Sequence, residues 1–346
     1  MTITASPALT TEVVGFTAGD GMPLNLHHVI GTRVPDRGPV LLVHGAGVRA
    51  DIFRAPEERN VVDALVAQGW DVWLENWRAS IDLPRNLWDL DQAAVHDHPY
   101  AVREVLQRTG ASSLKAIVHC QGSSSFVLSA VSGLIEGVDT IVSNAMSLHP
   151  VIPSFARFKI QYVVPMITPL MPFVDPHWGD HEPPERLDRL MVDAVDATHR
   201  ECRNRVCKMV SFTYGSGRPA LWSHDNLSGR THDWLRTEFG PVPMTFFHQM
   251  ARSVRRGHLV SNGALGLPVD PTARAPQTDA RFVLLAGSDN RCFLPESQRR
   301  TFAYLDGHAP GRHAFHELRG YGHLDVFMGR YASRDTIPLI LEELEP

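Results

Sequence analysis

The chain has 346 residues, of which 43% are hydrophobic and 21% are charged, and its formal net charge is −5. These values are ordinary for a globular protein, and the length allows one large α/β domain with a sizeable insertion. The acidic balance and the absence of a long basic run argue against nucleic acid as a partner. Four cysteines are too few for a disulfide framework in this length, so a reducing compartment is the simpler inference.

Residues 1–16 lack the basic start and the apolar stretch of a signal peptide. The longest uncharged apolar stretch, residues 162–174, contains three prolines and is too short to cross a bilayer. We therefore expect a cytoplasmic protein without a transmembrane segment. The sequence gives no indication of its oligomeric state.

The first part of the chain alternates between strand-like and helix-like segments. Residues 39–43 form a continuous apolar run, as a strand buried on both faces requires. Residues 19–21 are a glycine-containing turn that joins the two opening strands. The alternation predicts an α/β fold with a mostly parallel sheet covered by helices. The expected strands cover residues 13–16, 24–30, 39–43, 71–77, 113–119 and 140–144, and the expected helices cover residues 60–68 and 91–107.

The alternation stops between residues 149 and 269, which are rich in proline, methionine and aromatic residues. We interpret residues 149–269 as a cap inserted into a hydrolase-like core that consists of residues 1–148 and 270–346. Such a cap would lie over the carboxyl ends of the strands, where open α/β sheets bind ligands. Its apolar start, residues 151–174, is either a helix packed on the core or the lining of a hydrophobic cleft, and the two are compatible. Beyond the cap, strands are expected over residues 281–286 and 312–318 and a final helix over residues 335–343.

Cys120 lies where the strand predicted over residues 113–119 meets a run of small residues that begins a helix. This strand–turn–helix context is that of a nucleophile elbow, whose usual pattern is Gly-x-Ser-x-Gly; here the pattern runs from Val118 to Gly122 as Val-His-Cys-Gln-Gly. The positive end of the helix dipole favours a thiolate at this position. The alternative is a buried cysteine that packs as a small apolar side chain, but the flanking pattern favours a nucleophile.

A cysteine nucleophile needs a base, and the base needs an orienting group. In this type of sheet the three follow one another in the order nucleophile, acid, histidine. Asp289 is the first acid past the strand predicted over residues 281–286, and His323 stands in a glycine-rich turn after the next strand. Cys120, Asp289 and His323 therefore form the expected catalytic triad. Asp325 is too near His323 in sequence to reach the far ring nitrogen, and a surface or capping role is expected for it.

Two backbone N–H groups are candidates for an oxyanion hole. Residues 44–47, His-Gly-Ala-Gly, follow the first central strand, and glycines let the backbone turn an N–H toward an anion. We expect the N–H of Ala46 to be one donor and the N–H of Gln121 to be the other. The alternative for residues 44–47 is a plain glycine-rich turn. His119, beside the nucleophile, is expected to pack against the site or support it.

No metal or cofactor site is expected. Cys202 and Cys207 are five residues apart on a predicted helix, a spacing that suits neither a disulfide nor a zinc site. His96 and His98 would lie on different faces of their helix. Residues 180–182, Asp-His-Glu, fall in a proline-rich loop and are expected to be solvated. Neither a dinucleotide-binding glycine pattern nor a phosphate-binding loop is found in the sequence.

On these motifs, the chain resembles the α/β-hydrolases over nearly its full length, and within them the acid-lipase branch. It is most similar to the hydrolase domains that are fused to, or encoded beside, cholesterol-oxidase-type flavin oxidoreductases of the GMC group. The resemblance implies a Cys–His–Asp hydrolase core with a lid, a hydrophobic substrate and a functional association with a flavin oxidoreductase. The chain differs from the usual elbow at Val118, where a small residue is normal. The segments that carry the resemblance are residues 71–80, 119–123, 212–215 and 320–325.

We therefore expect a hydrolase that acts on a hydrophobic ester, thioester or lactone through an acyl-cysteine intermediate. A thiolate leaves a tetrahedral intermediate more readily than an alkoxide does, so activated acyl groups are better substrates than plain alkyl esters. The same energy-rich intermediate would suit transfer of the acyl group to an alcohol or amine, and an acyltransferase is the first alternative. A catalytically idle fold that binds an apolar ligand or a partner protein is the second alternative.

Overall fold

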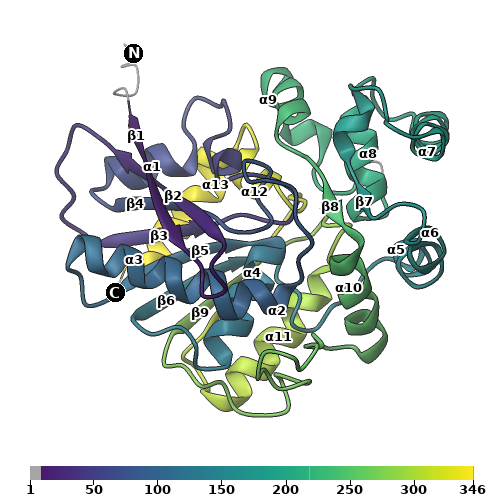
Figure 1. The fold of residues 1–346 in the computed structure, drawn as a ribbon. Helices are drawn as coiled ribbons and strands as arrows, with labels where there is room; N and C mark the ends of the chain where they lie inside the picture. The colour runs from purple at the N-terminus through teal and green to yellow at the C-terminus, as the bar shows by residue number, and fades with distance from the viewer. Residues whose placement is uncertain (1–8, 218, 346) are drawn as a thin grey trace.

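The computed structural model describes residues 9–217 and 219–345, and its centre is an eight-stranded sheet in the order β1-β2-β4-β3-β5-β6-β9-β10 (Figure 1). β1 and β2 pair antiparallel with each other, and β2 pairs antiparallel with β4; every other pairing is parallel. The predicted α/β fold with a mostly parallel sheet is thus confirmed. The strands are β1 Thr10–Thr17, β2 Pro23–Ile30, β3 Pro39–Val43, β4 Asp71–Asn76, β5 Leu114–His119, β6 Val138–Asn144, β9 Arg281–Gly287 and β10 Ala314–Leu318.

The central strands are buried on both faces because both faces carry apolar side chains. All five residues of β3 are buried, and β3 pairs with β4 on one side and with β5 on the other. Helices α1 and α14 contact each other on one face of the sheet, and α3 and α4 contact each other on the opposite face (Figure 1). The helices of this core are α1 Val61–Ala67, α2 Leu90–Gln92, α3 His98–Thr109, α4 Cys120–Val131, α11 Pro295–His308, α12 Asp325–Met328, α13 Ala332–Asp335 and α14 Ile337–Leu344, with a 3-10 helix at Ala50–Arg54.

The long helix expected over residues 91–107 is interrupted. Between α2 and α3, residues Ala93–Asp97 form a π-helical turn, in which the N–H of His98 bonds the carbonyl of Ala93 five residues back. Pro99 supplies the reason, because it has no N–H to donate and its ring crowds the preceding turn. The helix therefore widens just before the proline and resumes as α3.

Residues 145–280 separate β6 from β9 and form a second group of helices on the right of Figure 1. Two short strands, β7 Phe173–Val174 and β8 Val242–Pro243, pair antiparallel within this segment, which we call the cap. None of the described helices is both long and apolar enough to cross a membrane. Residues 1–8, on which the expectation of no signal peptide partly rests, lie outside the described part of the chain. The cap helices are α5 Ser154–Phe158, a π-turn Lys159–Val163, α6 Val164–Ile167, α7 Arg186–Thr198, α8 Arg205–Tyr214, α9 Gly229–Trp234 and α10 Met244–Arg256, with 3-10 turns at Pro176–Gly179, His224–Asn226 and Leu235–Thr237.

Candidate active site

Cys120 is the first residue of α4 and follows directly on β5, so the predicted strand–turn–helix junction is present. Its φ of 55° is positive, a conformation that non-glycine residues adopt rarely and that often marks a functional turn. Gly122 explains why the pattern needs a glycine two residues later, since a Cβ there would lie 2.0 Å from the carbonyl oxygen of His44. The glycine thus lets α4 approach the end of β3 and holds the junction against the sheet.

The electrostatic environment of Cys120 favours the thiolate. Burial raises the pKa of this thiol, but hydrogen bonds from Cys292, His323 and the backbone N–H of Gln121 outweigh it and hold the pKa well below its usual range. Hydrogen bonding to Cys120, together with burial, raises the pKa of Cys292, so Cys292 stays a thiol and donates. These contacts favour the thiolate form of Cys120 over the thiol.

His323 is buried and lies beside Cys120: one ring nitrogen of His323, one of His119 and the Cys120 sulfur are all within 4.8 Å of one another. The predicted acid does not reach it. Asp289 is exposed, and its carboxylate accepts a hydrogen bond from the Ser288 hydroxyl at 3.0 Å. The next residue, Asn290, is buried and its amide nitrogen lies 3.1 Å from Nδ1 of His323. In the structure the residue that contacts Nδ1 of His323 is therefore Asn290, and not the predicted Asp289.

The amide of Asn290 has one orientation that satisfies its neighbours. Its oxygen accepts from the backbone N–H of Cys292 at 2.9 Å and of Phe293 at 3.1 Å, so the NH₂ group must face His323. Nδ1 of His323 is therefore an acceptor, and the neutral imidazole carries its proton on Nε2. A carboxylate in the same place would instead hold the proton on Nδ1 and stabilise an imidazolium.

The expected oxyanion-hole donors lie beside the sulfur. Ala46 lines the small space that also contains Cys120 and His323. No described residue accepts a hydrogen bond from the N–H of Ala46, which leaves that group available for an anion. Its carbonyl accepts a hydrogen bond of 3.0 Å from the hydroxyl of Tyr214, on α8 of the cap, which fixes the turn. The N–H of Gln121, the second expected donor, lies near enough to the sulfur to lower the pKa of the thiol.

His119 supports the site and does not compete for its chemistry. Its Nδ1 lies 3.0 Å from the side-chain nitrogen of Asn144, which also donates to the carbonyl of His323 at 2.8 Å. Burial lowers the pKa of His119 well below its ordinary value, so its ring is neutral. Asp325, expected at the surface or as a cap, is buried; its carboxylate accepts from the N–H of Gly322 at 2.7 Å and fixes the turn that carries His323.

An apolar cavity of about 850 Å³, including its open mouth, begins at Cys120. The start of the cap lines one wall, so the apolar stretch predicted over residues 151–174 provides a cavity lining. Lys159 is the charged residue among the described lining residues, and burial lowers its pKa to about 8. Its Nζ donates to the carbonyl oxygens of Phe212 and Gly215. The wall consists mainly of Ile152, Ala156, Ile160, Val163, Val164 and Ile167 from the cap start and of Met244, Phe246, Phe247, Met250 and Val254 from α10.

Sequence reasoning missed Asn290, Cys292 and Tyr214. Asn290 and Cys292 follow Asp289 by one and three residues. Their position after the end of a strand could have pointed to them, but Asp289 has the same position. Asn290 differs from Asp289 in burial, a property set by the turn of the backbone and not by residue type. Tyr214 comes from the cap, and no sequence spacing relates it to Ala46.

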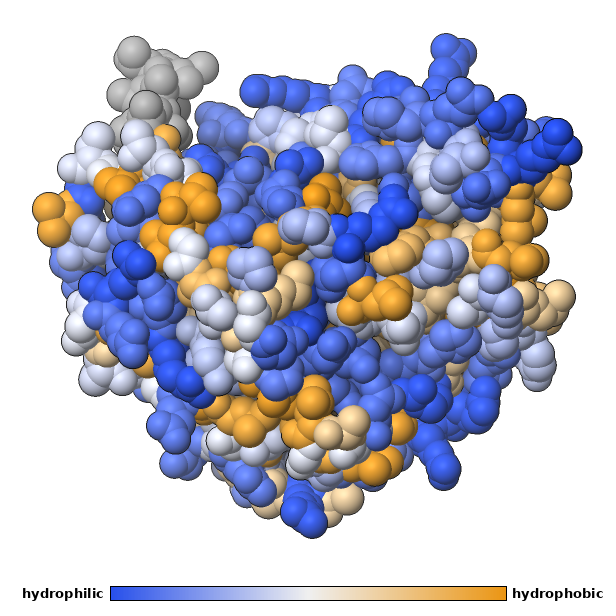
Figure 2. All heavy atoms as spheres, in the orientation of Figure 1, coloured by the Kyte–Doolittle hydropathy of each residue, from blue (hydrophilic) through white to orange (hydrophobic). Residues whose placement is uncertain are grey.

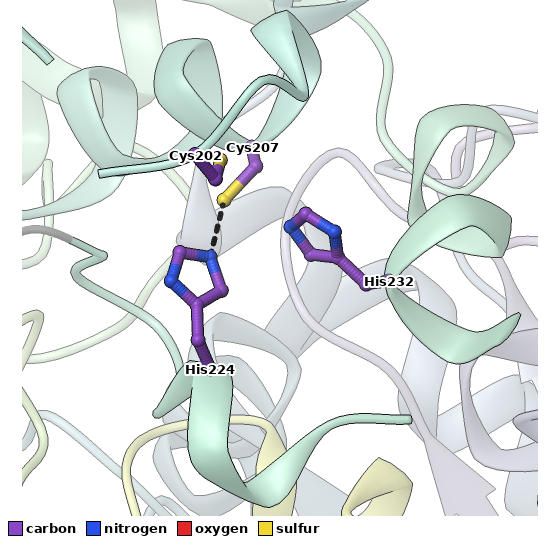
Figure 3. A group of neighbouring side chains, drawn as sticks. All are labelled: Cys202, Cys207, His224 and His232. Carbon is purple, nitrogen blue, oxygen red and sulfur yellow. Dashed lines mark hydrogen bonds between the residues drawn. The ribbon is translucent and has the colours of Figure 1, made fainter. Parts of the chain in front are cut away.

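A second cysteine–histidine cluster lies in the cap, where no metal site was expected (Figure 3). A spacing of five residues excludes a common metal site only if Cys202 and Cys207 lie on the same helix. Cys202 instead lies in the loop before α8, so the loop can bring its sulfur to Cys207. The potential ligand atoms of Cys202, Cys207, His224 and His232 all lie within 4.8 Å of one another.

Known structures share this fold. A monoacylglycerol lipase of Paleococcus ferrophilus matches with a TM-score of 0.56 and 14% identity, over 96% of this chain and 97% of that one. An esterase of Pyrococcus furiosus matches with a TM-score of 0.57 and 10% identity, over 97% of this chain and 91% of that one. At such identities the likeness establishes the α/β-hydrolase fold alone.

In sequence, the chain is similar to sterol esterase 2 of Saccharomyces cerevisiae, with 25% identity over 157 residues. That match covers 38% of this chain and 29% of the yeast protein, so the chain matches less than a third of the length of that relative. No family model matches the chain.

Proposed function

We propose that this chain is a carboxylic ester hydrolase whose nucleophile is Cys120 and whose substrates are hydrophobic esters or thioesters with good leaving groups. The observation that carries the proposal is the position of Cys120, on a positive-φ turn at the end of β5, beside His323 and in the lining of an apolar cavity. The fold shared with lipases and esterases, and the partial likeness to a sterol esterase, support the same reaction class.

The first half-reaction begins with the thiolate of Cys120. Its sulfur attacks the acyl carbon, a C–S bond forms, and the carbonyl electron pair moves onto the oxygen. The N–H groups of Ala46 and Gln121 are placed to stabilise that oxyanion. When the oxyanion collapses, the bond to the leaving group breaks and an acyl-cysteine remains.

Asn290 determines which leaving groups can depart. An alkoxide must be protonated as it leaves, and the donor would be an imidazolium with protons on both nitrogens of His323. In that imidazolium the Nδ1–H would face the NH₂ group of Asn290, which offers it no acceptor. Thiolates and phenolates depart without a proton. Thioesters and aryl esters are therefore the proposed substrates, and alkyl esters of the same acid are poorer ones.

The same contact slows the second half-reaction. Water can attack the acyl-cysteine when Nε2 of His323 accepts its proton, but the neutral ring carries a proton on Nε2. The acyl-cysteine should therefore be long-lived. This favours acyl transfer as a second candidate function, because an amine acceptor bound in the cavity can attack without a strong base. The apolar lining, which excludes water, supports it further.

The cavity indicates the acyl group. Its lining is apolar except near Lys159 and the reacting groups, as is usual for sites that bind apolar small molecules. The outer side of the cap start is apolar as well, and hydrophobic atoms gather at the right-hand edge of Figure 2, where α5 and α6 lie. We propose a long-chain or sterol-like acyl substrate on these grounds. The exposed apolar residues of this segment are Phe155, Phe158, Tyr162, Met166 and Leu170.

Intact-protein mass spectrometry tests the proposal. The protein is incubated with a p-nitrophenyl ester, a thioester and a methyl ester of one long-chain acid. We expect the first two to add one acyl mass to the wild type and the methyl ester to react much more slowly. Cys120→Ala should form no adduct, whereas Cys292→Ala, which removes another buried thiol of the same cavity, should still form one. If folded wild type forms no adduct and turns over no ester but binds the free acid, the protein is a non-catalytic binding protein and the proposed enzyme activity is wrong.

A further inference from the structure

The cap contains four side chains with metal-binding atoms that no part of the active-site chemistry uses. Cys202 comes from the loop before α8, Cys207 from the first turn of α8, His224 from a 3-10 turn and His232 from α9. In Figure 3 the two sulfurs and the two imidazoles point toward a common centre. None of the four lines the cavity at Cys120.

The separations suit a tetrahedral metal ion. With Zn–S near 2.3 Å and Zn–N near 2.0–2.1 Å, the edges of a Cys₂His₂ tetrahedron are about 3.3–3.8 Å. Cys207 Sγ and His224 Nε2 are 3.4 Å apart, and each of the other ligand pairs is within 4.8 Å. The two imidazole rings stand nearly perpendicular, at 89°, with centroids 4.9 Å apart. Closing on a metal would therefore move the side chains by about 1 Å or less.

Two further atoms point to a ligand. Nε2 of His232 is buried, and among the described residues no group forms a hydrogen bond of ordinary geometry with it, although the ring lies beside Cys202. A metal ion would give this buried nitrogen a full partner. The buried indole N–H of Trp222 lies beside Cys207. It could donate to a metal-bound thiolate, as groups around zinc sites commonly do.

We propose that Cys202, Cys207, His224 and His232 bind a structural zinc ion. Two thiolates and two neutral imidazoles balance the charge of Zn²⁺, and binding releases the two thiol protons. Four protein ligands complete the tetrahedron and leave no open position for substrate, which is the pattern of a structural site. The ion joins the loop before α8, α8 itself, the 3-10 turn at His224–Asn226 and α9.

This site stabilises the turn that carries His323. The segment containing His224 begins at Leu221, whose carbonyl accepts from the N–H groups of His323 at 3.0 Å and Leu324 at 2.8 Å. Ser223 donates its N–H to Asp325 at 3.1 Å. By fixing residues 221–226, the zinc ion would hold the neighbouring turn without touching the substrate.

A disulfide between Cys202 and Cys207 is the competing state of the same residues. A disulfide would give neither His224 nor His232 a ligand to bind, and Nε2 of His232 would keep no hydrogen bond of ordinary geometry among the described residues. The two states differ in mass, since a disulfide removes two hydrogens and zinc adds a metal that chelators extract.

The test uses the full chain purified under reducing conditions and loaded with Zn²⁺ alone. Elemental analysis should give one zinc per chain after exhaustive dialysis, and a strong chelator should remove it and lower the Tm. Replacement by Co²⁺ should give the thiolate charge-transfer and intense visible bands of a tetrahedral thiolate site. Cys207→Ser and His232→Ala should each weaken Zn²⁺ binding by about tenfold or more. Cys292→Ala, which removes a buried thiol elsewhere, should bind like the wild type.

Sub-stoichiometric zinc in reduced, reloaded wild type would overturn the proposal, and so would a Co²⁺ spectrum without thiolate bands. These two measurements use the wild type, so they remain decisive if a ligand variant fails to fold. A wild type that contains no zinc and has lost two hydrogens, with a Cys202–Cys207 linkage in its peptide map, would assign the disulfide instead.

Discussion

The molecule contains two cysteine–histidine clusters, and they differ in what surrounds the sulfur. At the elbow, one sulfur lines an apolar cavity, and its histidines contact Asn144 and Asn290. In the cap, the ligand atoms of two cysteines and two histidines lie within 4.8 Å of one another. The residue types are the same, but the first arrangement leaves the sulfur open to a substrate and the second can satisfy every ligand atom with one metal ion.

The difference shows that the reactivity of a cysteine sulfur depends on whether a substrate can reach it and on how many metal-binding groups surround it. A thiolate is a nucleophile when one side of it is free, and it is a ligand when its neighbours supply the remaining corners of a tetrahedron. His119, Cys120 and His323 are close enough to resemble a metal site. Asn144 holds Nδ1 of His119, however, and Asn290 holds Nδ1 of His323, which fixes both rings for support of the sulfur.

The largest effect should come from removing the two sulfurs separately. Cys120→Ala should lower kcat/KM for a p-nitrophenyl ester by about 10³-fold or more, because the variant lacks the proposed nucleophile. Its zinc content should not change. Cys207→Ser should lose zinc and keep the ability to form an acyl adduct at a temperature where it remains folded. Steady-state kinetics and elemental analysis of both variants check this, and zinc loss in Cys120→Ala would contradict the division of roles.

Alkylation should separate the clusters in the wild type. With a small apolar maleimide in limiting amount, we expect Cys120 to react first, because its thiolate faces the cavity. Cys202 and Cys207 should be slower by about 100-fold while zinc is bound, since a metal-bound thiolate is masked, and faster after chelation. Peptide mass mapping over time measures the three rates. Equal rates for Cys202 with and without chelator would mean that no metal protects it.

Asn290 and Asp289 give a matched pair of adjacent variants. Asn290→Ala should lower kcat/KM by about 10–100-fold through loss of the hydrogen bond that orients His323, whereas Asp289→Ala should change it by about twofold or less. Asn290→Asp should hydrolyse the acyl-cysteine faster and accept alkyl esters better, because a carboxylate stabilises the imidazolium. Single-turnover decay of the adduct measures this. A large loss of kcat/KM in Asp289→Ala but not in Asn290→Ala would show that Asp289 is the acid of the triad, as predicted from the sequence.

The smallest effect concerns pH. Cys292 donates to the thiolate and so lowers the pKa of Cys120, although burial acts in the opposite direction. The thiolate is the active form, so activity rises as pH rises through this pKa. Cys292→Ala should raise the pKa and move the acidic limb of kcat/KM to higher pH. The loss at neutral pH should be about tenfold or less, since one neutral hydrogen bond contributes about 1 kcal/mol. An unchanged or acid-shifted profile would show that Cys292 does not donate.

The sequence predicted the parts of the site that short motifs encode. The junction at Cys120 depends on a strand, a glycine and a helix that are contiguous in the chain, and His323 depends on a glycine-rich turn after a strand. Asn290 could not be chosen over Asp289 from the sequence, because both follow the same strand and only the direction of the turn decides which one is buried. Residue type in fact favoured the aspartate.

Features that join distant segments lay beyond sequence reasoning. The four ligands of the cap cluster are spread over residues 202–232. The sequence predicts Cys202 and Cys207 on one helix, but α8 begins only at Arg205, so Cys202 lies outside it. The apolar stretch at the cap start was predicted as a possible cleft lining, because hydrophobicity is local information. What it packs against, α10, depends on the tertiary fold. Pro99, next to which the long helix is interrupted, is visible in the sequence, but the π-helical turn before it depends on the local backbone.

The attachment of residues 221–226 has a consequence for how substrates enter. This segment is tied to the core by Leu221 and by Asn226, which donates to the carbonyl of Gly320 at 2.8 Å and accepts from the N–H of Arg330 at 2.7 Å. The cap is therefore attached to the core at its middle as well as at its two ends, and a rigid-body movement of the whole cap would displace the turn that carries His323. A local movement of α5 and α6 would leave the attachment of residues 221–226 in place.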